Sequence, residues 1–158
     1  EPKPIFSEVP TLLGTDGRKM SKSYGNGFLL TQEEDEVVKT LRAMPTDPAR
    51  VRRADVGEPT RCPVYSFHKL YSSPADLVWV EEGCRTAGIG CGDCKKKLGE
   101  NVNLAMAAPR AKKKDLLNSP DTLDSIISDG CDRARKEAGQ QLEQVREWTG
   151  FQPSGDWV

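Results

Sequence analysis

The sequence is poor in histidine, in long apolar runs and in net charge. Its one histidine is His68, so any mechanism that needs two histidines is excluded from these 158 residues. The longest apolar run, residues 104–108, has five members, whereas a membrane-spanning helix needs about 18 or more. Lysine and arginine (23) nearly balance aspartate and glutamate (24), for a net charge of −1. A membrane span and a uniformly cationic coat for nucleic acid are therefore excluded, although a local basic face is not.

The start of the chain lacks two further features. Residues 1–4 read Glu-Pro-Lys-Pro, with neither an initiator methionine nor the apolar core of a secretory leader. A chain of this length accommodates one domain, or one domain and a fragment of another. We therefore expect a cytoplasmic protein, and a piece of a longer chain.

The pattern of proline, glycine and apolar residues predicts a mainly α protein, a helical bundle preceded by a glycine-rich loop in residues 1–30. Thr31 and Glu34 form a capping-box pattern, which predicts a helix start at Thr31, and Pro45 is expected to end that helix. A long helix is expected over residues 93–118. Further helix starts are expected at prolines that follow a capping or turn residue, namely Pro63, Pro74 and Pro120.

Apolar residues recur at helical spacing and are expected to face the interior. In the long helix these are Leu98, Val102, Leu104 and Met106. The last helix is expected to bury Leu123, Ile126, Ile127, Ala134, Ala138, Leu142, Val145 and Trp148.

Two lysines lie three positions apart in a loop flanked by glycine. Lys19 and Lys22 alternate there with Ser21 and Ser23. Such a loop can surround a polyphosphate. Each lysine ammonium is a mobile positive charge, which can stabilise negative charge as it develops on the phosphates. The serine hydroxyls and the backbone N–H groups can add hydrogen bonds. On composition alone, however, a solvated surface loop is the more ordinary interpretation.

The longer string around these lysines resembles a family signature. Residues 14–26 read Gly-Thr-Asp-Gly-Arg-Lys-Met-Ser-Lys-Ser-Tyr-Gly-Asn, which closely resembles the Lys-Met-Ser-Lys-Ser signature of class I aminoacyl-tRNA synthetases. The flanks are similar to the tryptophan–tRNA ligase branch, with tyrosine–tRNA ligases as the nearest alternative. The resemblance implies a ligase loop that closes over ATP and Mg as ATP is converted to AMP and pyrophosphate. It implies catalytic roles for Lys19 and Lys22, and an ATP site of Lys19, Met20, Ser21, Lys22 and Ser23.

The resemblance also implies that half of the enzyme is missing. Class I synthetases need a His-x-Gly-His signature on a Rossmann half, and a chain with one histidine lacks it. Residues 1–30 then resemble the end of the nucleotide-binding domain, and residues 31–158 the helical anticodon-binding domain. The fragment alone is expected to be inactive. Its parent is expected to bind ATP, tryptophan and a tryptophan-specific tRNA, and to dimerise through the missing half.

Four of the five cysteines, Cys62, Cys84, Cys91 and Cys94, have the spacing C-x21-C-x6-C-x2-C. Their clustering favours metal ligation over a disulfide framework, and soft thiolates suit Zn²⁺ or an iron–sulfur cluster. His68 could replace one cysteine in a Cys₃His zinc site. The spacing resembles, with one residue fewer, the C-x22-C-x6-C-x2-C pattern of those tryptophan–tRNA ligases that carry a [4Fe–4S] cluster. The resemblance implies such a cluster in a structural, RNA-positioning role, with zinc as the alternative.

Basic residues gather on the expected long helix and predict phosphate contacts with tRNA. Taken singly, each is better explained as part of a solvated helix face. Arginines of the connector between residues 45 and 60, Arg50 among them, add to the positive charge. Two other functions remain open, a stand-alone metal-stapled RNA-binding module and a zinc-stapled interaction domain without RNA affinity. The candidate tRNA-binding residues are Lys95, Lys96, Lys97, Arg110, Lys112, Lys113 and Lys114.

Overall fold

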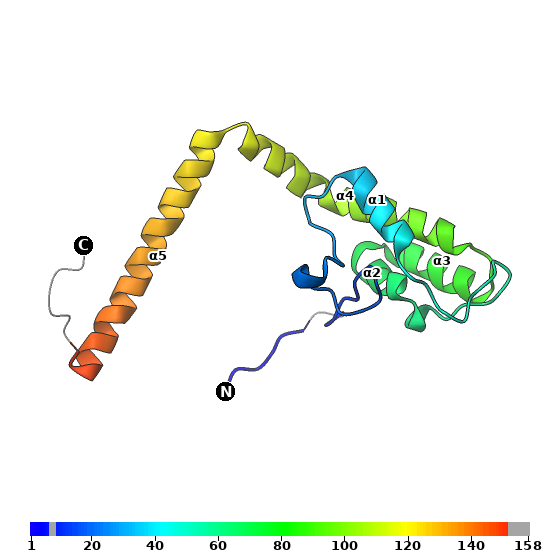
Figure 1. Ribbon diagram of the computed structural model, residues 1–158, viewed down its shortest axis with the longest axis horizontal. Coiled ribbons are helices and arrows are strands. Elements are labelled where there is room, and N and C mark those ends of the chain that lie inside the picture. Colours follow the sequence, from blue (N-terminus) through cyan, green and yellow to red (C-terminus); the bar gives the residue numbers. More distant parts are fainter. Residues whose placement is uncertain (7–8, 152–158) are drawn as a thin grey trace. The chain divides into compact units, whose positions relative to one another are not determined.

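The computed structural model describes residues 1–6 and 9–151 (Figure 1). Within these residues there is no β-strand, only an isolated antiparallel bridge between Leu13 and Lys19. The mainly α fold expected from the sequence is confirmed. No helix of the described part has both the length and the hydropathy to span a membrane. The helices are α1 (Glu34–Ala43), α2 (Pro63–Tyr71), α3 (Pro74–Arg85), α4 (Cys91–Leu117) and α5 (Pro120–Thr149), with short 3-10 helices η1 (Lys22–Tyr24) and η2 (Pro59–Arg61).

The chain divides into two compact units, Glu1–Ala111 and Lys112–Val158. The first unit contains the loop with the lysines, α1, α2, α3 and most of α4. The second contains the end of α4 and all of α5. The functional boundary between residues 30 and 31 is a separate matter and stays a prediction.

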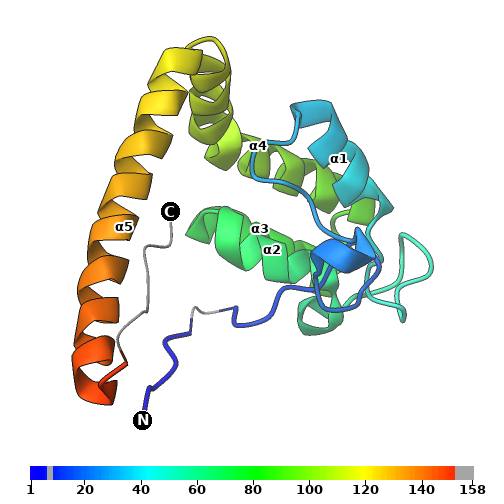
Figure 2. The same cartoon turned by 60° about the vertical axis from the view of Figure 1, so that its left-hand side comes forward.

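The core of the first unit forms where α1, α2 and α4 meet, and its residues are at most 2% exposed. α1 lies against α4 (Figures 1 and 2), where a side chain on Gly99 would meet Val38 at 3.3 Å. Met20 of the lysine loop and two of the cysteines pack against this core. Both candidate sites are thus positioned by one core, which consists of Val37, Leu41, Met44, Val64, Phe67, Leu98, Val102 and Met106.

Most of the expected helix boundaries are confirmed. α2, α3 and α5 begin at the predicted prolines, and Ser73 Oγ caps α3 by accepting the N–H of Asp76 at 3.1 Å. Gly150 ends α5 with a φ of 64°, in the left-handed region that favours glycine.

The helix start predicted at Thr31 is wrong. α1 begins at Glu34, and the side chain of its N-cap residue, Glu33, forms no capping hydrogen bond. The cause is a tertiary contact, because Arg110 Nε of α4 donates to the carbonyl of Gln32 at 2.6 Å. That carbonyl therefore does not join the α1 hydrogen-bond ladder, and the helix starts three residues later than Thr31.

Two burial predictions are also wrong. Leu104 is 78% exposed, because it lies two residues from buried Val102 and so on the opposite side of α4. In α5 none of the described residues is buried, and Ile126 and Trp148 of its apolar face are exposed. Among the described residues of the second unit, only the end of α4 accompanies this helix.

Candidate functional sites: the lysine loop and the cysteine cavity

The lysine loop is closed by its own backbone. The N–H of Met20 donates to the carbonyl of Leu12 at 3.0 Å, and that of Thr15 donates to the carbonyl of Asn26 at 2.7 Å. Gly17 allows the turn between them, since its φ of 78° lies in the left-handed region. The loop therefore has a defined conformation in which both ends are tied together.

Asn26 holds the centre of this loop from inside. Its side chain is 3% exposed, and Nδ2 donates to Asp16 Oδ1 at 2.8 Å and to the carbonyl of Lys19 at 3.2 Å. Its Oδ1 accepts the N–H of Ser21 at 2.8 Å. The hydrogen bond from Asn26, together with the backbone N–H of Arg18, lowers the pKa of Asp16 to about 2. Asp16 is therefore ionised at neutral pH and keeps the asparagine oriented.

The predicted ATP-binding side chains lie on the outside of this frame. Lys19 and Lys22 are exposed, and among the described residues neither forms an ion pair. Ser21 and Ser23 share a hydrogen bond of 2.8 Å between their hydroxyls. Met20 points the other way and packs on the core. The loop thus presents two uncompensated cations and two hydroxyls, while its methionine serves as an anchor.

The four cysteines of the spacing pattern all line one cavity of about 30 Å³. Cys62 lies at the start of α2 and Cys84 in the last turn of α3, whereas Cys91 and Cys94 lie in the first turn of α4. None of the five cysteines forms a disulfide. The structure thus brings these four side chains to one cavity, whereas Cys131 is not in its lining and is exposed on α5.

A site for a single metal ion is not formed by these side chains as they lie. Within the described part of the chain, no three histidine, cysteine, aspartate or glutamate residues are close enough to hold one ion. His68, the alternative zinc ligand, is fully buried with Nε2 3.3 Å from Sγ of Cys94. The geometry therefore gives no direct support for zinc, whether held by four cysteines or by three cysteines and His68.

Burial makes the cysteine cavity unfavourable for thiolates on their own. Desolvation raises the pKa of Cys62 and of Cys84, and it raises the pKa of Cys94 to about 12. Repulsion from the neighbouring cysteines adds to the shift at Cys94. Four ionised sulfurs in this cavity therefore need positive charge, from a bound cation, from the protein or from both.

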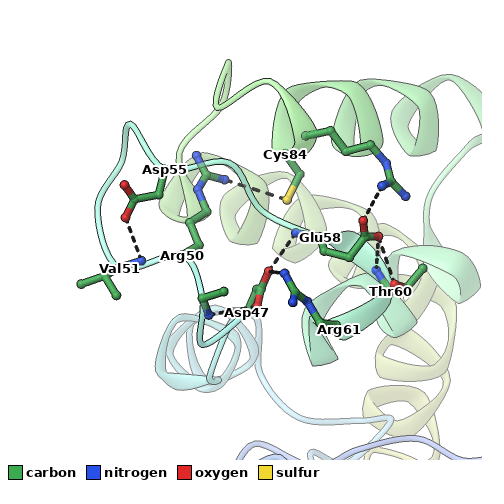
Figure 3. Close-up of polar contacts among 10 residues, drawn as sticks. Asp47, Arg50, Val51, Asp55, Glu58, Thr60, Arg61 and Cys84 are labelled. Carbon is green, nitrogen blue, oxygen red and sulfur yellow. Dashed lines mark hydrogen bonds and ion pairs between the residues drawn. The ribbon is translucent and has the colours of Figure 1, made fainter.

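Arg50 lines the same cavity, and its guanidinium supplies a positive charge beside the sulfur of Cys84 (Figure 3). It is 8% exposed, and Nη2 donates to the carbonyls of Ile89 and Arg53 at 2.6 and 3.0 Å. Nη1 lies 4.0 Å from Sγ of Cys84, and Nε is buried without a partner. No carboxylate among the described residues pairs with Arg50, although an unpaired buried charge is costly. The donor set therefore fits an anionic thiolate-bound group.

The connector around Arg50 is fixed by Asp47. This carboxylate is buried and accepts the N–H of Glu58 at 2.8 Å and Nη2 of Arg61 at 3.1 Å (Figure 3). These hydrogen bonds hold the pKa of Asp47 below its usual range. Next to Glu58, a side chain on Gly57 would lie 2.6 Å from Sγ of Cys84. Only glycine therefore lets the connector pass so close to the cavity.

The candidate tRNA-binding residues fall into two groups. Lys95 donates to the carbonyls of Arg42 and Met44 at the end of α1, Lys97 pairs with Asp76 at 3.2 Å, and Arg110 joins α4 to Gln32. These three side chains hold helices together. The remaining candidates, Lys96, Lys112, Lys113 and Lys114, are exposed.

Comparison with known proteins identifies the class. Residues 1–107 match the family of class I tRNA synthetases for tryptophan and tyrosine (W and Y), and the chain belongs to this family. It is 41% identical to the tryptophan–tRNA ligase of Ralstonia nicotianae over 96% of this chain and 38% of the relative. It is 46% identical to that of Thermotoga maritima over 92% of this chain and 45% of the relative.

A solved structure agrees with this assignment. Tryptophanyl-tRNA synthetase from Campylobacter jejuni, complexed with ADP and tryptophan, is 30% identical and superposes with a TM-score of 0.77. The match covers 91% of this chain and 44% of that one. The chain thus spans less than half the length of the relatives it matches. These relatives favour the tryptophan branch over the tyrosine branch.

Proposed function

We propose that this chain is the C-terminal part of a tryptophan–tRNA ligase, with residues 1–30 ending the nucleotide-binding domain and residues 31–158 forming the tRNA-binding domain. The family match over residues 1–107 carries this proposal, and the named relatives support tryptophan as the amino acid. In the parent enzyme, ATP and tryptophan form tryptophanyl-adenylate and pyrophosphate, and the tryptophan then passes to tRNA. We expect these 158 residues alone to be inactive, because they contain no His-x-Gly-His signature.

In this proposal the lysine loop binds the phosphates of ATP. Lys19 and Lys22 stabilise the charge that develops on the departing pyrophosphate, which is the role that exposed ammonium groups can fill. The hydroxyls of Ser21 and Ser23 and the backbone near Met20 complete the nucleotide site. The exposure of both lysines and their lack of an ion pair among the described residues support these roles.

Lys22→Ala in the full-length parent tests the loop. We expect tryptophan-dependent ATP–pyrophosphate exchange to slow by about 10²–10³-fold, the usual effect of losing one donor to transition-state charge. Binding of tRNA should change little, because the loop acts on ATP. Lys39→Ala is the matched control, since Lys39 is also exposed but lies on α1. Equal losses in exchange and in tRNA binding would contradict the assignment.

We also propose that Cys62, Cys84, Cys91 and Cys94 hold a [4Fe–4S] cluster. Bound there, such a cluster would cross-link α2, α3 and α4 and provide structural support. All four cysteines line one cavity, and four thiolates would be the donor set for such a cluster. Arg50 offsets the negative charge of the thiolates. Zinc is the second candidate, and the metal content of the chain separates the two.

The exposed lysines of α4 are proposed to contact tRNA phosphates. Lys96, Lys112, Lys113 and Lys114 are the candidates on the surface, and phosphate contacts of this kind make binding weaken as salt rises. Lys95, Lys97 and Arg110 support the helices that carry them. A zinc-stapled domain without RNA affinity would show no such salt dependence.

A further inference from the structure

One cysteine of the cavity, Cys94, contacts a buried histidine that lies outside the cavity lining. His68 Nε2 of α2 lies 3.3 Å from Sγ of Cys94 of α4. The histidine side chain is fully buried, and it packs inside the first unit rather than on its surface. One ring nitrogen is therefore directed at a sulfur of the proposed metal site.

A row of polar side chains fixes the other edge of the ring. Nδ1 of His68 lies 2.7 Å from Oγ of Ser72. Nδ2 of Asn101 donates to the same Oγ at 2.9 Å and to Oδ2 of Asp76 at 3.0 Å, and Asp76 pairs with Lys97 at the surface. Because Asn101 already donates to Ser72, the hydroxyl hydrogen is free to go to Nδ1. The ring hydrogen is then on Nε2, facing Cys94.

We infer that His68 is a positioning residue of the metal site, whose Nε2–H donates a hydrogen bond to the metal-bound Sγ of Cys94. This rests on the proposed role of Cys94 as a ligand. A metal-bound thiolate carries no hydrogen, so a hydrogen bond between the two atoms requires the histidine as donor. Hydrogen bonds of this kind orient a ligand and raise metal affinity by about 10–100-fold. At an iron–sulfur cluster they also shift the reduction potential.

His68→Leu and His68→Gln in this chain, reconstituted with iron and sulfide, separate the hydrogen bond from packing. The glutamine amide can donate from near the position of Nε2, whereas leucine fills the space without a donor. We expect the leucine variant to lose iron to a chelator about tenfold faster or more, and to be reduced at a more negative potential. The glutamine variant should stay close to the unmodified chain in both measurements.

Three results would overturn the inference. If His68→Leu releases iron at the same rate and has the same reduction potential as the unmodified chain, the histidine does not act on Cys94. If the leucine and glutamine variants change iron release and reduction potential by the same amount, His68 acts through packing alone. An unmodified chain that takes up no metal would overturn the cysteine site itself, and the inference with it.

Ser72→Ala gives a second test that leaves the buried ring in place, in case His68→Leu does not fold. Loss of the hydroxyl removes the partner that keeps the hydrogen on Nε2. Iron should then be released faster than from the unmodified chain. Unchanged release from Ser72→Ala would contradict the role of the polar row.

Discussion

Asn26 is an uncharged residue on which the conformation of the lysine loop depends. It contacts the loop through three hydrogen bonds, with Asp16, Lys19 and Ser21. It also explains why glycine occupies position 14, where a side chain would lie 2.4 Å from the asparagine. The ammonium groups of Lys19 and Lys22 are therefore free to move, while the backbone that carries them is held in place.

Asn26→Ala should loosen the lysine loop in this chain. The N–H of Ser21 loses its acceptor, so its exchange with deuterium should speed up by about tenfold or more, as expected for the loss of a buried hydrogen bond. Ser23→Ala is the control, because Ser23 is exposed and its hydroxyl contacts the Ser21 hydroxyl rather than the Ser21 N–H. Unchanged exchange at Ser21 in Asn26→Ala would show that the backbone alone holds the loop.

Some of the residues at the two sites could be predicted from the sequence and others could not. The four cysteines stand out by their type and spacing, and the two lysines by a contiguous string. Arg50 looked like one more basic residue of a connector, although it lies beside Cys84, 34 positions away. His68 and Cys94 are 26 positions apart. Such pairs form only when helices pack, and no local pattern of residues encodes them.

At the scale of elements, close packing of α1 on α4 sets the geometry of the first unit. Gly99 faces Val38 at 3.3 Å and Leu41 at 3.9 Å, measured from the position that a side chain would occupy. Lys95 and Arg110 then join the two ends of α1 to α4 through backbone carbonyls. The cysteines in the first turn of α4 are thereby fixed relative to the core.

Gly99→Val should destabilise the first unit by about 1–3 kcal/mol, because the added side chain overpacks the contact between α1 and α4. Denaturant unfolding followed by circular dichroism measures the effect. Gly130→Ala is the control on α5, where nothing lies within 4 Å and the change should stabilise the helix by up to about 1 kcal/mol. A stability of Gly99→Val equal to that of the unmodified chain would contradict the close packing.

Local signals predicted those helix boundaries that local chemistry determines. A proline in the first turn marks α2, α3 and α5, and Gly150 ends the last helix. The start of α1 was missed because Arg110 intervenes from 78 positions away. Leu104 was misplaced for a different reason, since its spacing from Val102 already puts it on the opposite side of the helix.

At the scale of the whole molecule, the chain is compared with relatives that are more than twice as long. It spans less than half the length of its relatives, and the described residues of α5 contain none that is buried. The lysine loop and the cysteine cavity belong to the same unit and share one core. In our proposal catalysis belongs to a full-length ligase, whereas all four cysteines of the cavity lie in this chain and can be tested on it.

Metal analysis of this chain, purified without air, tests most directly the claim that the cysteine cavity is a metal centre. We expect about four iron atoms per chain and a visible spectrum with broad absorption at about 400 nm. Cys91→Ser should lose the iron and melt at a lower temperature, whereas Cys131→Ser, changed at an exposed site on α5, should keep it. One zinc and no colour would replace the cluster by a zinc site. A chain with neither metal, even after reconstitution, would contradict the metal centre.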